Sequence, residues 1–306
     1  MSFTFSDVTA RLPALAEHPR LPLFDAATPI EPMTRAGAEL GLTLDVKRDD
    51  LLPLAMGGNK VRQLEFYFGQ AQAAGADSVL ITGAVQSNFV RLCAAAARRQ
   101  GWRPVVQLED RVPKDDPAYN TSGNLLLVQL LGAEIHRFPE GENVAAADAN
   151  LDRLAEGLRA QGAKPFVIHL GIEHPPFGAL GYAAAAVEAY LQFEARGGFP
   201  DSIVIPSGSG LTHAGFLVGA RALGWDVPVY GICVRRDADA QRQRIERRAQ
   251  EVAKLLGGVQ LQPADVQVFD DVLAPGYGQM NPDVRAAIDL AARSDAILLD
   301  PVYSGK

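Results

Sequence analysis

Short apolar runs rich in β-branched residues alternate along this chain with Ala-rich stretches long enough to form helices, and glycine-bearing turns join them. Near-continuous apolar strands that alternate with helices are typical of parallel sheets covered on both faces. The pattern therefore predicts an α/β protein. Eight runs are predicted as strands: 78–82, 104–108, 134–138, 165–170, 202–205, 227–234, 266–269 and 296–299.

Eight strands would also suit a closed βα barrel. Their spacing is uneven, however, and a long polar stretch over residues 140–158 separates two of them near the middle of the chain. We therefore expect two open, twisted, mostly parallel sheets with helices on both faces. The smaller domain is expected over residues 60–170, and the larger domain over residues 1–59 and 171–306.

The balance of charge excludes several classes of protein. The 306 residues include 29 Lys and Arg against 36 Asp and Glu, which gives a net charge of −7. A nucleic-acid-binding protein would normally carry a basic face, so no nucleic-acid partner is expected. The basic run at 242–248 is interrupted by Gln243 and Glu246, and such mixed charge predicts a solvated helix face.

Targeting signals and metal motifs add little. No segment approaches the roughly 18 consecutive apolar residues of a membrane helix, and residues 1–20 include Asp7 and Glu17 without the apolar core of a secretory signal. A cytoplasmic protein with no membrane partner is expected. Cys93 and Cys233 show neither a disulfide framework nor C-x-x-C spacing. The histidines lack H-E-x-x-H spacing, so no metal site is predicted.

Ligands of open α/β sheets bind beyond the carboxyl ends of strands, and the first junction of interest is PSGSGLTHAG at residues 206–215. Gly208 and Gly210 let the backbone fold closely around an anion. The helix that follows offers free N–H groups and the positive end of its dipole, and Thr212 adds a hydroxyl. The junction predicts a phosphate site, although a tight turn would also need glycine.

This junction also resembles a dinucleotide fingerprint, but only poorly. His213 stands where G-x-G-x-x-G has its third glycine, and the next strand ends in Arg235 and Arg236 instead of an acidic ribose ligand. The two arginines leave open an NADP-dependent oxidoreductase, in which they would hold the ribose phosphate. That interpretation leaves the next two junctions unexplained.

The second junction is TGAVQSN at residues 82–88, before a helix predicted over 89–99. Gln86, Ser87 and Asn88 bring side-chain donors to the N–H groups of a helix start, which suits a substrate carboxylate. Ser and Asn are also ordinary helix N-caps, so a purely structural role stays open.

The third junction places Lys60 at a helix start, after Gly57 and Gly58. A cation is disfavoured at the positive end of a helix dipole, so this lysine is expected to be offset by an anion, well solvated or uncharged. An uncharged lysine is what a Schiff base requires, and the glycines leave room for a planar ring. With a phosphate site and a carboxylate site, it completes the parts that a pyridoxal phosphate enzyme needs.

Five motifs follow one another along the chain: KRDDLLPLAMGGNKVRQLEF, TGAVQSNFVR, PSGSGLTHAG, APGYG and LDPVYSGK. In sequence and order they resemble the family of 1-aminocyclopropane-1-carboxylate (ACC) deaminases and D-cysteine desulfhydrases, which are fold-type II, tryptophan-synthase-β-like enzymes. The resemblance covers essentially the whole chain and implies pyridoxal 5′-phosphate as cofactor, an active site between two domains and a homodimer. The sequence ends at Lys306, with the last motif, whereas family members continue through further helical sequence.

The resemblance implies a role for each residue that matches a family motif. Lys60 would form the Schiff base and exchange the proton at the substrate Cα, while Ser87 would move protons on the opposite face of the ring. Tyr277 and Tyr303 would flank cofactor and substrate, and one of them would assist the leaving group. The remaining implied contacts are those of Asn88 with the pyridine hydroxyl, of Gly208, Ser209, Gly210, Leu211 and Thr212 with the phosphate, and of Gln86, Ser87, Asn88 and Phe89 with the substrate.

The residue after Tyr303 separates the branches of this family. Members similar to the deaminases have a glutamate there, which keeps the pyridine nitrogen protonated and the electron sink strong. Here it is Ser304, as in the desulfhydrase-like branch, and a weaker sink suffices for β-elimination. We therefore expect D-cysteine to yield pyruvate, hydrogen sulfide and ammonia, and we disfavour the cyclic substrate. A serine next to glycine is also a common turn residue.

Two aromatic residues depart from the family pattern. Phe89 stands where the desulfhydrase branch usually has a histidine, and Phe177 replaces a smaller aliphatic residue. Either these rings narrow the substrate pocket or they pack into the core. D-cysteine is thus the default substrate, with another β-substituted amino acid, or a non-catalytic binding protein on the same scaffold, as alternatives.

Overall fold

A computed structural model of the protein describes residues 3–112, 114, 116–141 and 143–306. The chain forms two compact units. The large unit contains Met1–Glu17, Asp25–Asp49 and Ala179–Lys306, and the small unit contains His18–Phe24 and Asp50–Gly178.

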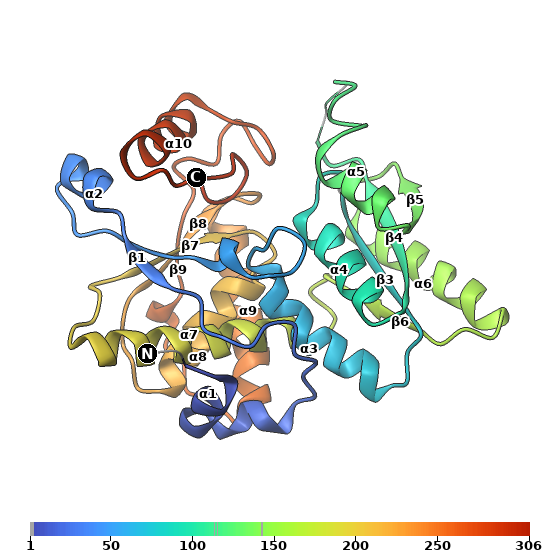
Figure 1. Cartoon of the computed structure of the whole chain (residues 1–306), viewed down its shortest axis with the longest axis horizontal. Coiled ribbons are helices and arrows are strands. Elements are labelled where there is room, and N and C mark those ends of the chain that lie inside the picture. Colours follow the sequence, from blue (N-terminus) through green and yellow to red (C-terminus); the bar gives the residue numbers. More distant parts are fainter. Residues whose placement is uncertain (1–2, 113, 115, 142) are drawn as a thin grey trace. The chain divides into compact units, whose positions relative to one another are not determined.

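The small unit is built on a four-stranded parallel sheet in the order β5-β4-β3-β6 (Figure 1). Ser78 at the start of β3 pairs with Arg103 on one side and with Pro165 on the other. All residues of β3 are buried. Because β3 lies between β4 and β6, the loop that follows it leaves from an inner strand of the sheet. The strands are β3 (Ser78–Ala84), β4 (Arg103–Glu109), β5 (Glu134–Phe138) and β6 (Pro165–Ile168).

Helices cover this sheet, as its apolar strands require. Leu80 and Val105 of the sheet form a buried cluster with Leu151, Ala155 and Leu158 of α6. Helix α4 lies against β3 and β4, and it also contacts α3 and α5. The helices are α3 (Lys60–Ala73), α4 (Asn88–Arg99), α5 (Gly123–Leu130) and α6 (Val144–Ala160).

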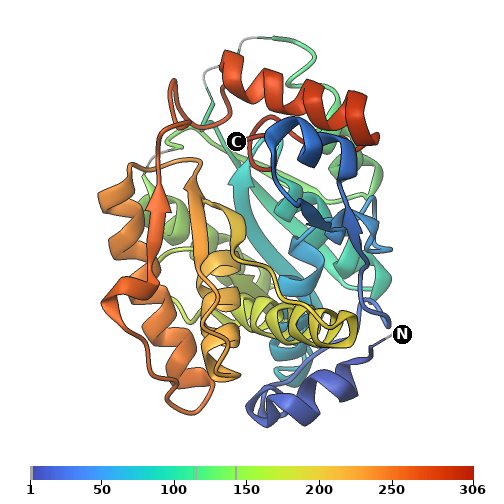
Figure 2. The ribbon, with the colours of Figure 1, turned by 90° about the vertical axis from the view of Figure 1, so that its left-hand side faces the viewer.

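The large unit contains a three-stranded parallel sheet, β7-β8-β9, with α8 and α9 packed on it (Figure 2). Glycines let α8 approach α7 closely, because a Cβ at Gly215 would clash with the carbonyl oxygen of Ala179. These elements are β7 (Ile203–Ser207), β8 (Val229–Cys233), β9 (Gln267–Phe269), α7 (Phe177–Arg196), α8 (Leu211–Ala222) and α9 (Ala238–Leu255).

A small antiparallel hairpin, β1 (Ile30–Pro32) with β2 (Asp45–Lys47), also belongs to the large unit and was not predicted. Three residues per strand are too few to give a readable alternation. The other helical elements are α1 (Phe5–Arg11), α2 (Thr34–Leu40), α10 (Pro282–Asp295) and the 3₁₀ turns Pro13–Glu17, Asp49–Leu51 and Pro263–Asp265.

The α/β class and the two open parallel sheets are confirmed, but the strand predicted at 296–299 is wrong. Ala296 has a left-handed backbone, φ 57°, and ends α10. Ile297 and Leu299 then pack separately on the cluster around Met33 and Ala36, while the side chain of Leu298 is exposed. The apolar residues of this run therefore serve to pack against helices α2 and α10, and the described residues form no strand here.

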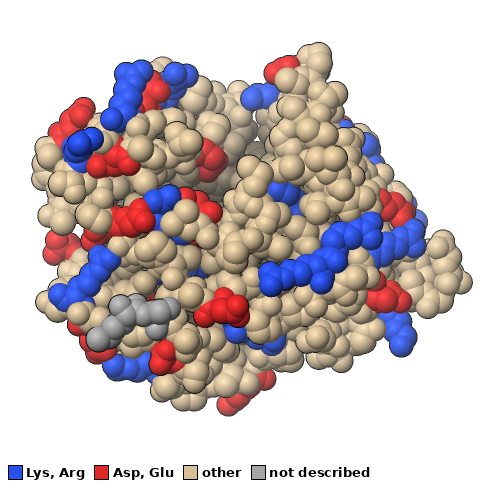
Figure 3. Space-filling view, viewed as in Figure 1, with Lys and Arg blue, Asp and Glu red and all other residues tan. Residues whose placement is uncertain are grey.

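Charges of both signs are interspersed on the face shown in Figure 3, and several form surface ion pairs such as Arg11–Glu194 and Arg103–Glu134. Among the described helices, none has the length and apolar character that crossing a membrane requires. Cys93 and Cys233 are both free and buried.

Candidate active site

The structure gathers the predicted site residues into two groups, one in each unit. Each group surrounds a loop that leads from the carboxyl end of a parallel strand into a helix, β3 to α4 and β7 to α8. The small unit holds Lys60, Gln86, Ser87, Asn88 and Phe89, and the large unit holds Gly208, Ser209, Gly210, Leu211, Thr212, Tyr277, Tyr303 and Ser304.

The backbone directly before Lys60 is strained. Ala55, Met56, Gly57 and Gly58 all have positive φ, at 40°, 70°, 65° and 115°. Gly57 is required, because a Cβ there would clash with the carbonyl oxygen of Asp50. Alanine and methionine rarely adopt this conformation, and such strain clusters where a site needs a fixed backbone.

Lys60 is the first residue of α3, and its Nζ lies 5.4 Å from the centre of the Phe89 ring. Within the described part of the chain, its ammonium has no hydrogen bond or ion pair. Burial of the side chain lowers the pKa of Lys60 to about 8. The structure thus holds a lysine whose neutral amine is accessible near physiological pH.

Ser87 caps α4, and its Oγ accepts a hydrogen bond of 3.3 Å from the N–H of Val90. Gly83 makes this turn possible, because a Cβ there would lie 2.9 Å from the same oxygen. The N–H groups of Asn88 and Phe89 donate to no acceptor among the described residues. They point along the start of a twelve-residue helix, which favours an anion such as a carboxylate.

The Gln86 side chain is hydrogen-bonded to the segment around the start of α5. Its side-chain Nε2 donates to the carbonyl oxygens of Tyr119 at 2.6 Å and Ser122 at 3.0 Å, and its Oε1 accepts from the N–H of Asn124 at 2.8 Å. The amide therefore braces the segment before α5, and its donors are already used. Any contact of Gln86 with a substrate carboxylate would have to come from its backbone.

Arg91 was not predicted from the sequence. It is buried, and it donates to Asn88 Oδ1 at 3.3 Å, to Asn124 Oδ1 at 3.0 Å and to the carbonyl oxygen of Gly57 at 2.9 Å. Burial lowers the pKa of Arg91 from its usual value. One guanidinium thus ties the start of α4 to the strained turn before Lys60. A charged residue inside an Ala-rich helix was the feature of the sequence from which a role for Arg91 could have been predicted.

The sequence left open whether the Phe89 ring narrows the substrate pocket or packs in the core. The ring is buried, lies 6.3 Å from that of Tyr67 and also faces Lys60. It therefore packs in the core and borders the site at the same time. Phe177, in contrast, is only partly buried.

In the large unit, the loop from Gly208 to Gly210 turns tightly between β7 and α8. Gly210 has φ 93°, and a Cβ there would lie 3.0 Å from Ile245 Cδ1. The N–H groups of Ser209, Gly210 and Leu211 donate to no acceptor in the described ranges. This arrangement fits an anion at the start of α8.

Arginines surround this loop, and they correct the prediction that residues 242–248 form a solvated helix face. Arg248 is 2% exposed, and the Arg244 Nε donates to the carbonyl oxygen of Ser209 at 2.7 Å. Arg236 donates to the carbonyl oxygen of Gly208 at 3.1 Å. Burial and then the charges of its neighbouring arginines lower the pKa of Arg244 to about 9. These positive charges repel one another, and a phosphate bound at the loop would offset that repulsion.

Tyr303 and Tyr277 lie beside the same loop. Their hydroxyl oxygens are 2.8 Å apart and hydrogen-bonded, and a Cβ at Gly208 would lie 3.4 Å from the Tyr303 ring. The guanidinium of Arg235 lies 6.0 Å from the centre of the Tyr277 ring. A hydroxyl pair near an arginine is suited to hold a proton or donate one.

The Ser304 hydroxyl is hydrogen-bonded within its own turn. It is exposed, and its hydroxyl donates to Asp300 Oδ2 at 2.9 Å while accepting from the N–H of Asp300. The hydroxyl thus stabilises the turn of Asp300, which is the structural role that the sequence left open.

Lys60 can react as a neutral amine and the loop at 208–212 can hold a phosphate, and these are the two attachments that pyridoxal phosphate needs. His213 is fully buried, and a Cβ at Gly231 would clash with its ring, so it occupies the close-packing position of a dinucleotide fingerprint.

Known proteins place the chain in the class of pyridoxal phosphate enzymes. Residues 21–306 match the family described as "Pyridoxal-phosphate dependent enzyme", and the chain belongs to that family.

Among its relatives are bacterial proteins named D-cysteine desulfhydrase. The chain is 42% identical to the one from Yersinia enterocolitica over 292 residues, which is 95% of this chain and 87% of the relative. It is 40% identical to the one from Salmonella typhi over the same shares. Similarity at this level over nearly the whole chain supports the same family.

Solved structures agree on the fold. A crystal structure described as an ACC deaminase homologue matches with a TM-score of 0.85 and 33% identity, covering 98% of this chain and 86% of the other. A crystal structure of a threonine deaminase matches with a TM-score of 0.60 and 18% identity, covering 98% and 90%, which supports the fold alone. Pyridoxal phosphate is therefore the cofactor, and the NADP-dependent alternative is wrong.

Proposed function

We propose that this enzyme is a D-cysteine desulfhydrase, which converts D-cysteine and water to pyruvate, hydrogen sulfide and ammonia. The proposal is supported by relatives of that name at about 40% identity. The observation that carries it is Lys60, which follows a strained turn, has no polar partner in the described chain and has a pKa of about 8. A half-buried lysine without a counter-charge is unusual, because lysines are mostly exposed or paired.

The residues fit pyridoxal phosphate at both of its attachments. Lys60 would bind its aldehyde carbon, and the N–H groups of 208–212 with the surrounding arginines would hold its phosphate. Asn88, whose Oδ1 is held by Arg91 and Asn124, would lie against the ring hydroxyl. When bound, the cofactor supplies an electron sink for negative charge at the substrate Cα.

Lys60 would also take and return the proton at the substrate Cα. A general base acts best when its pKa is near the working pH, and burial brings the pKa of Lys60 to about 8. The Phe89 ring, 5.4 Å from Nζ, keeps that side of the amine free of competing hydrogen bonds. Lys60 would therefore act both as the residue that binds the cofactor and as the base that exchanges the Cα proton.

The substrate carboxylate would be held by the start of α4. The N–H groups of Asn88 and Phe89 are available among the described contacts, and Ser87 Oγ lies at the same turn. Arg91 fixes this turn relative to the backbone before Lys60 through Gly57. The carboxylate thereby orients the substrate, which is the main contribution that positioning makes to the rate.

The Tyr277 and Tyr303 hydroxyls would supply the proton to the departing sulfur. They share one hydrogen bond of 2.8 Å, so either can donate while the other keeps it oriented. The guanidinium of Arg235 lies over the Tyr277 ring and helps to hold that ring in place.

The test combines absorbance with product analysis. The purified protein should carry a visible imine band and release pyruvate and sulfide from D-cysteine. In Lys60→Ala the band should be lost and the rate should fall by at least about 10³-fold. Lys164→Ala, an exposed lysine of the same unit, is the matched control and should keep both.

Each outcome separates one alternative. A protein that reacts with ACC, or with another β-substituted amino acid, and not with D-cysteine would contradict the substrate and keep the cofactor chemistry. A band without any keto-acid product would favour a non-catalytic binding protein. A homodimer, implied by the family resemblance alone, would be tested by light scattering of the same sample.

A further inference from the structure

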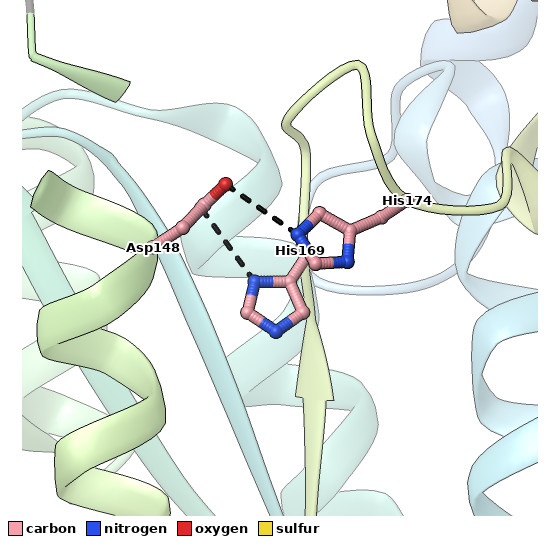
Figure 4. A group of neighbouring side chains, drawn as sticks. All are labelled: Asp148, His169 and His174. Atoms are coloured by element: carbon pink, nitrogen blue, oxygen red, sulfur yellow. Dashed lines mark ion pairs between the residues drawn. The ribbon is translucent and has the colours of Figure 1, made fainter. Parts of the chain in front are cut away.

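Three side chains that the proposed reaction does not use converge in the small unit. Asp148 comes from α6, His169 follows β6 directly, and His174 lies in the loop that leads to α7 (Figure 4). One ligand atom from each lies within 4.8 Å of the others. His169 Nδ1 is 3.6 Å from Asp148 Oδ1, and His174 Nε2 is 3.8 Å from Asp148 Oδ2.

His169 is oriented by a second carboxylate. Its Nε2 lies 3.0 Å from Asp152 Oδ1, one turn further along α6, and a proton on Nε2 satisfies that contact. Nδ1 is buried and has no hydrogen-bond partner among the described residues. A metal ion bound at Nδ1 would take the place of a second ring proton. A carboxylate that orients one nitrogen of a histidine while the other faces a cation is the usual outer contact of a metal ligand.

A positive charge is required where these groups face each other. His169 Nδ1 and a carboxylate oxygen of Asp148 lie side by side with little solvent, since both side chains are about 14% exposed or less. Two such atoms repel each other unless a proton or another cation lies between them. A divalent metal ion can replace that proton and take His174 as a third ligand.

We propose that Asp148, His169 and His174 bind one divalent transition-metal ion of the Zn²⁺ class. Two imidazoles and a carboxylate with an open position are a known ligand set for zinc. Bonds of about 2.0–2.2 Å to a tetrahedral ion would place ligand atoms about 3.3–3.6 Å apart. The distances of 3.6 and 3.8 Å run to different oxygens of Asp148, and one ligand atom from each residue lies within 4.8 Å of the others. Metal binding would therefore draw the three ligand atoms together by up to about 1.5 Å.

Coordination also requires the two rings to tilt. His169 and His174 are now stacked, with ring centres 3.9 Å apart and an angle of 10° between their planes. A metal must lie near the plane of each ring, so each would rotate about χ2, which is a soft torsion in histidine. Gly171 leaves room for Asp148, since a Cβ there would clash with its Oδ2.

The ion would join α6 to the loop between β6 and α7. That loop has no regular secondary structure over residues 169–176, and Phe177 follows it. A metal would fix its conformation at two points, His169 and His174. The sequence did not predict this site because its ligands are five and 21 or more residues apart and fit no short motif.

Metal binding is measured on the cofactor-loaded protein after treatment with a chelator and removal of free cofactor. Calorimetry with ZnCl₂ should show one equivalent bound, and CoCl₂ should give visible d–d bands separate from the imine band. His174→Ala and Asp148→Asn should each weaken Zn²⁺ at least tenfold. Asp152→Asn, which removes only the orienting carboxylate, should weaken it by about 10–100-fold.

His136→Ala is the matched control. His136 lies 2.8 Å from Glu134 in the same unit and is a histidine–carboxylate pair without a second histidine. It should leave both stoichiometry and affinity unchanged. The imine band and the circular dichroism spectrum report whether each variant is folded, so loss of metal binding in a folded variant supports the site.

Two results would overturn the proposal. If the wild-type protein binds neither Zn²⁺ nor Co²⁺, the gap between His169 and Asp148 is filled by a proton alone. If binding is unchanged in folded His174→Ala and Asp148→Asn, the metal lies elsewhere. Neither result depends on the enzyme's activity toward D-cysteine.

Discussion

The two groups of site residues differ in how they use charge. In the small unit, the turn around Ser87 is held mainly by neutral amides, with Arg91 as the guanidinium at the centre of the network. In the large unit, several arginines gather behind one glycine loop, with Arg244 and Arg236 bonded to its carbonyls.

The difference follows from what each group has to hold. A phosphate keeps its charge throughout, so fixed cations near it are favourable at every step. A lysine that must gain and lose a proton needs an environment in which neither form is strongly preferred, and a nearby carboxylate would raise its pKa too far. The arginines also take the carbonyl side of the loop, which leaves its N–H groups for the anion.

Among the variants that test this comparison, the largest expected effect is that of Arg91→Met. It cuts the link from Asn88 to Gly57 and leaves their oxygens without this donor, so kcat/KM should fall about 100-fold. Cofactor affinity should change less than about threefold, because the charges around the phosphate are untouched. Arg98→Met, which also loses bonds to backbone carbonyls but at the other end of α4, is the control. Equal losses in both variants would contradict a role specific to the turn.

Arg248→Met tests the other side of the comparison. It removes a buried cation packed behind Gly210, so pyridoxal phosphate should bind about tenfold more weakly, which corresponds to one moderate electrostatic contact. With saturating cofactor, kcat should stay within about twofold. The neighbouring exposed Arg247→Met should bind cofactor normally. Titration of the apoprotein, followed by the imine band, measures both.

The pH dependence of cofactor capture tests the neutral character of Lys60. The neutral amine reacts, and with a pKa of about 8 it is the minor form at pH 7 and the major form at pH 9. The capture rate should therefore rise about tenfold between pH 7 and pH 9 and then level off. An ordinary lysine would continue to gain about tenfold per pH unit up to pH 10. Stopped-flow absorbance separates the two profiles, and butylamine provides the reference.

The smallest effect is expected from Ser304→Ala. Its hydroxyl bonds to Asp300, so its loss should shift the stability slightly and leave the position of the imine band unchanged. A shifted band would show that the hydroxyl reaches the pyridine nitrogen after all. Asp300→Asn, which perturbs the same turn from its other partner, distinguishes an indirect effect.

Local pattern predicted much of the fold, and the exceptions have identifiable causes. The buried run around Leu80 has the apolar composition of a central strand, and it is one. The run at 296–299 has similar composition but lies on a helix pair, and composition does not tell which partner an apolar side chain meets. Met56 shows the same limit for the backbone, since its positive φ is imposed by the turn and not by its own preference.

The site shows what a one-dimensional motif omits. Lys60 and the glycine loop are readable because backbone geometry there requires particular residue types. Arg248 looked like part of a solvated run, and only the packing of α9 on the loop reveals it as buried. Gln86 was assigned to the substrate because it lies in the right loop, whereas its side chain faces the segment before α5.

The burial of both cysteines affects how an enzyme that would release sulfide tolerates its product. Burial raises the pKa of the Cys93 thiol, and burial followed by the charges of Asp270 and Asp237 raises the pKa of Cys233 to about 11. Sulfide adds to a cysteine only after an oxidant has converted that cysteine to a sulfenic acid or a disulfide, and this oxidation starts from an accessible thiolate. Buried, protonated thiols resist that first oxidation, so we expect neither cysteine to take up sulfur as sulfide accumulates.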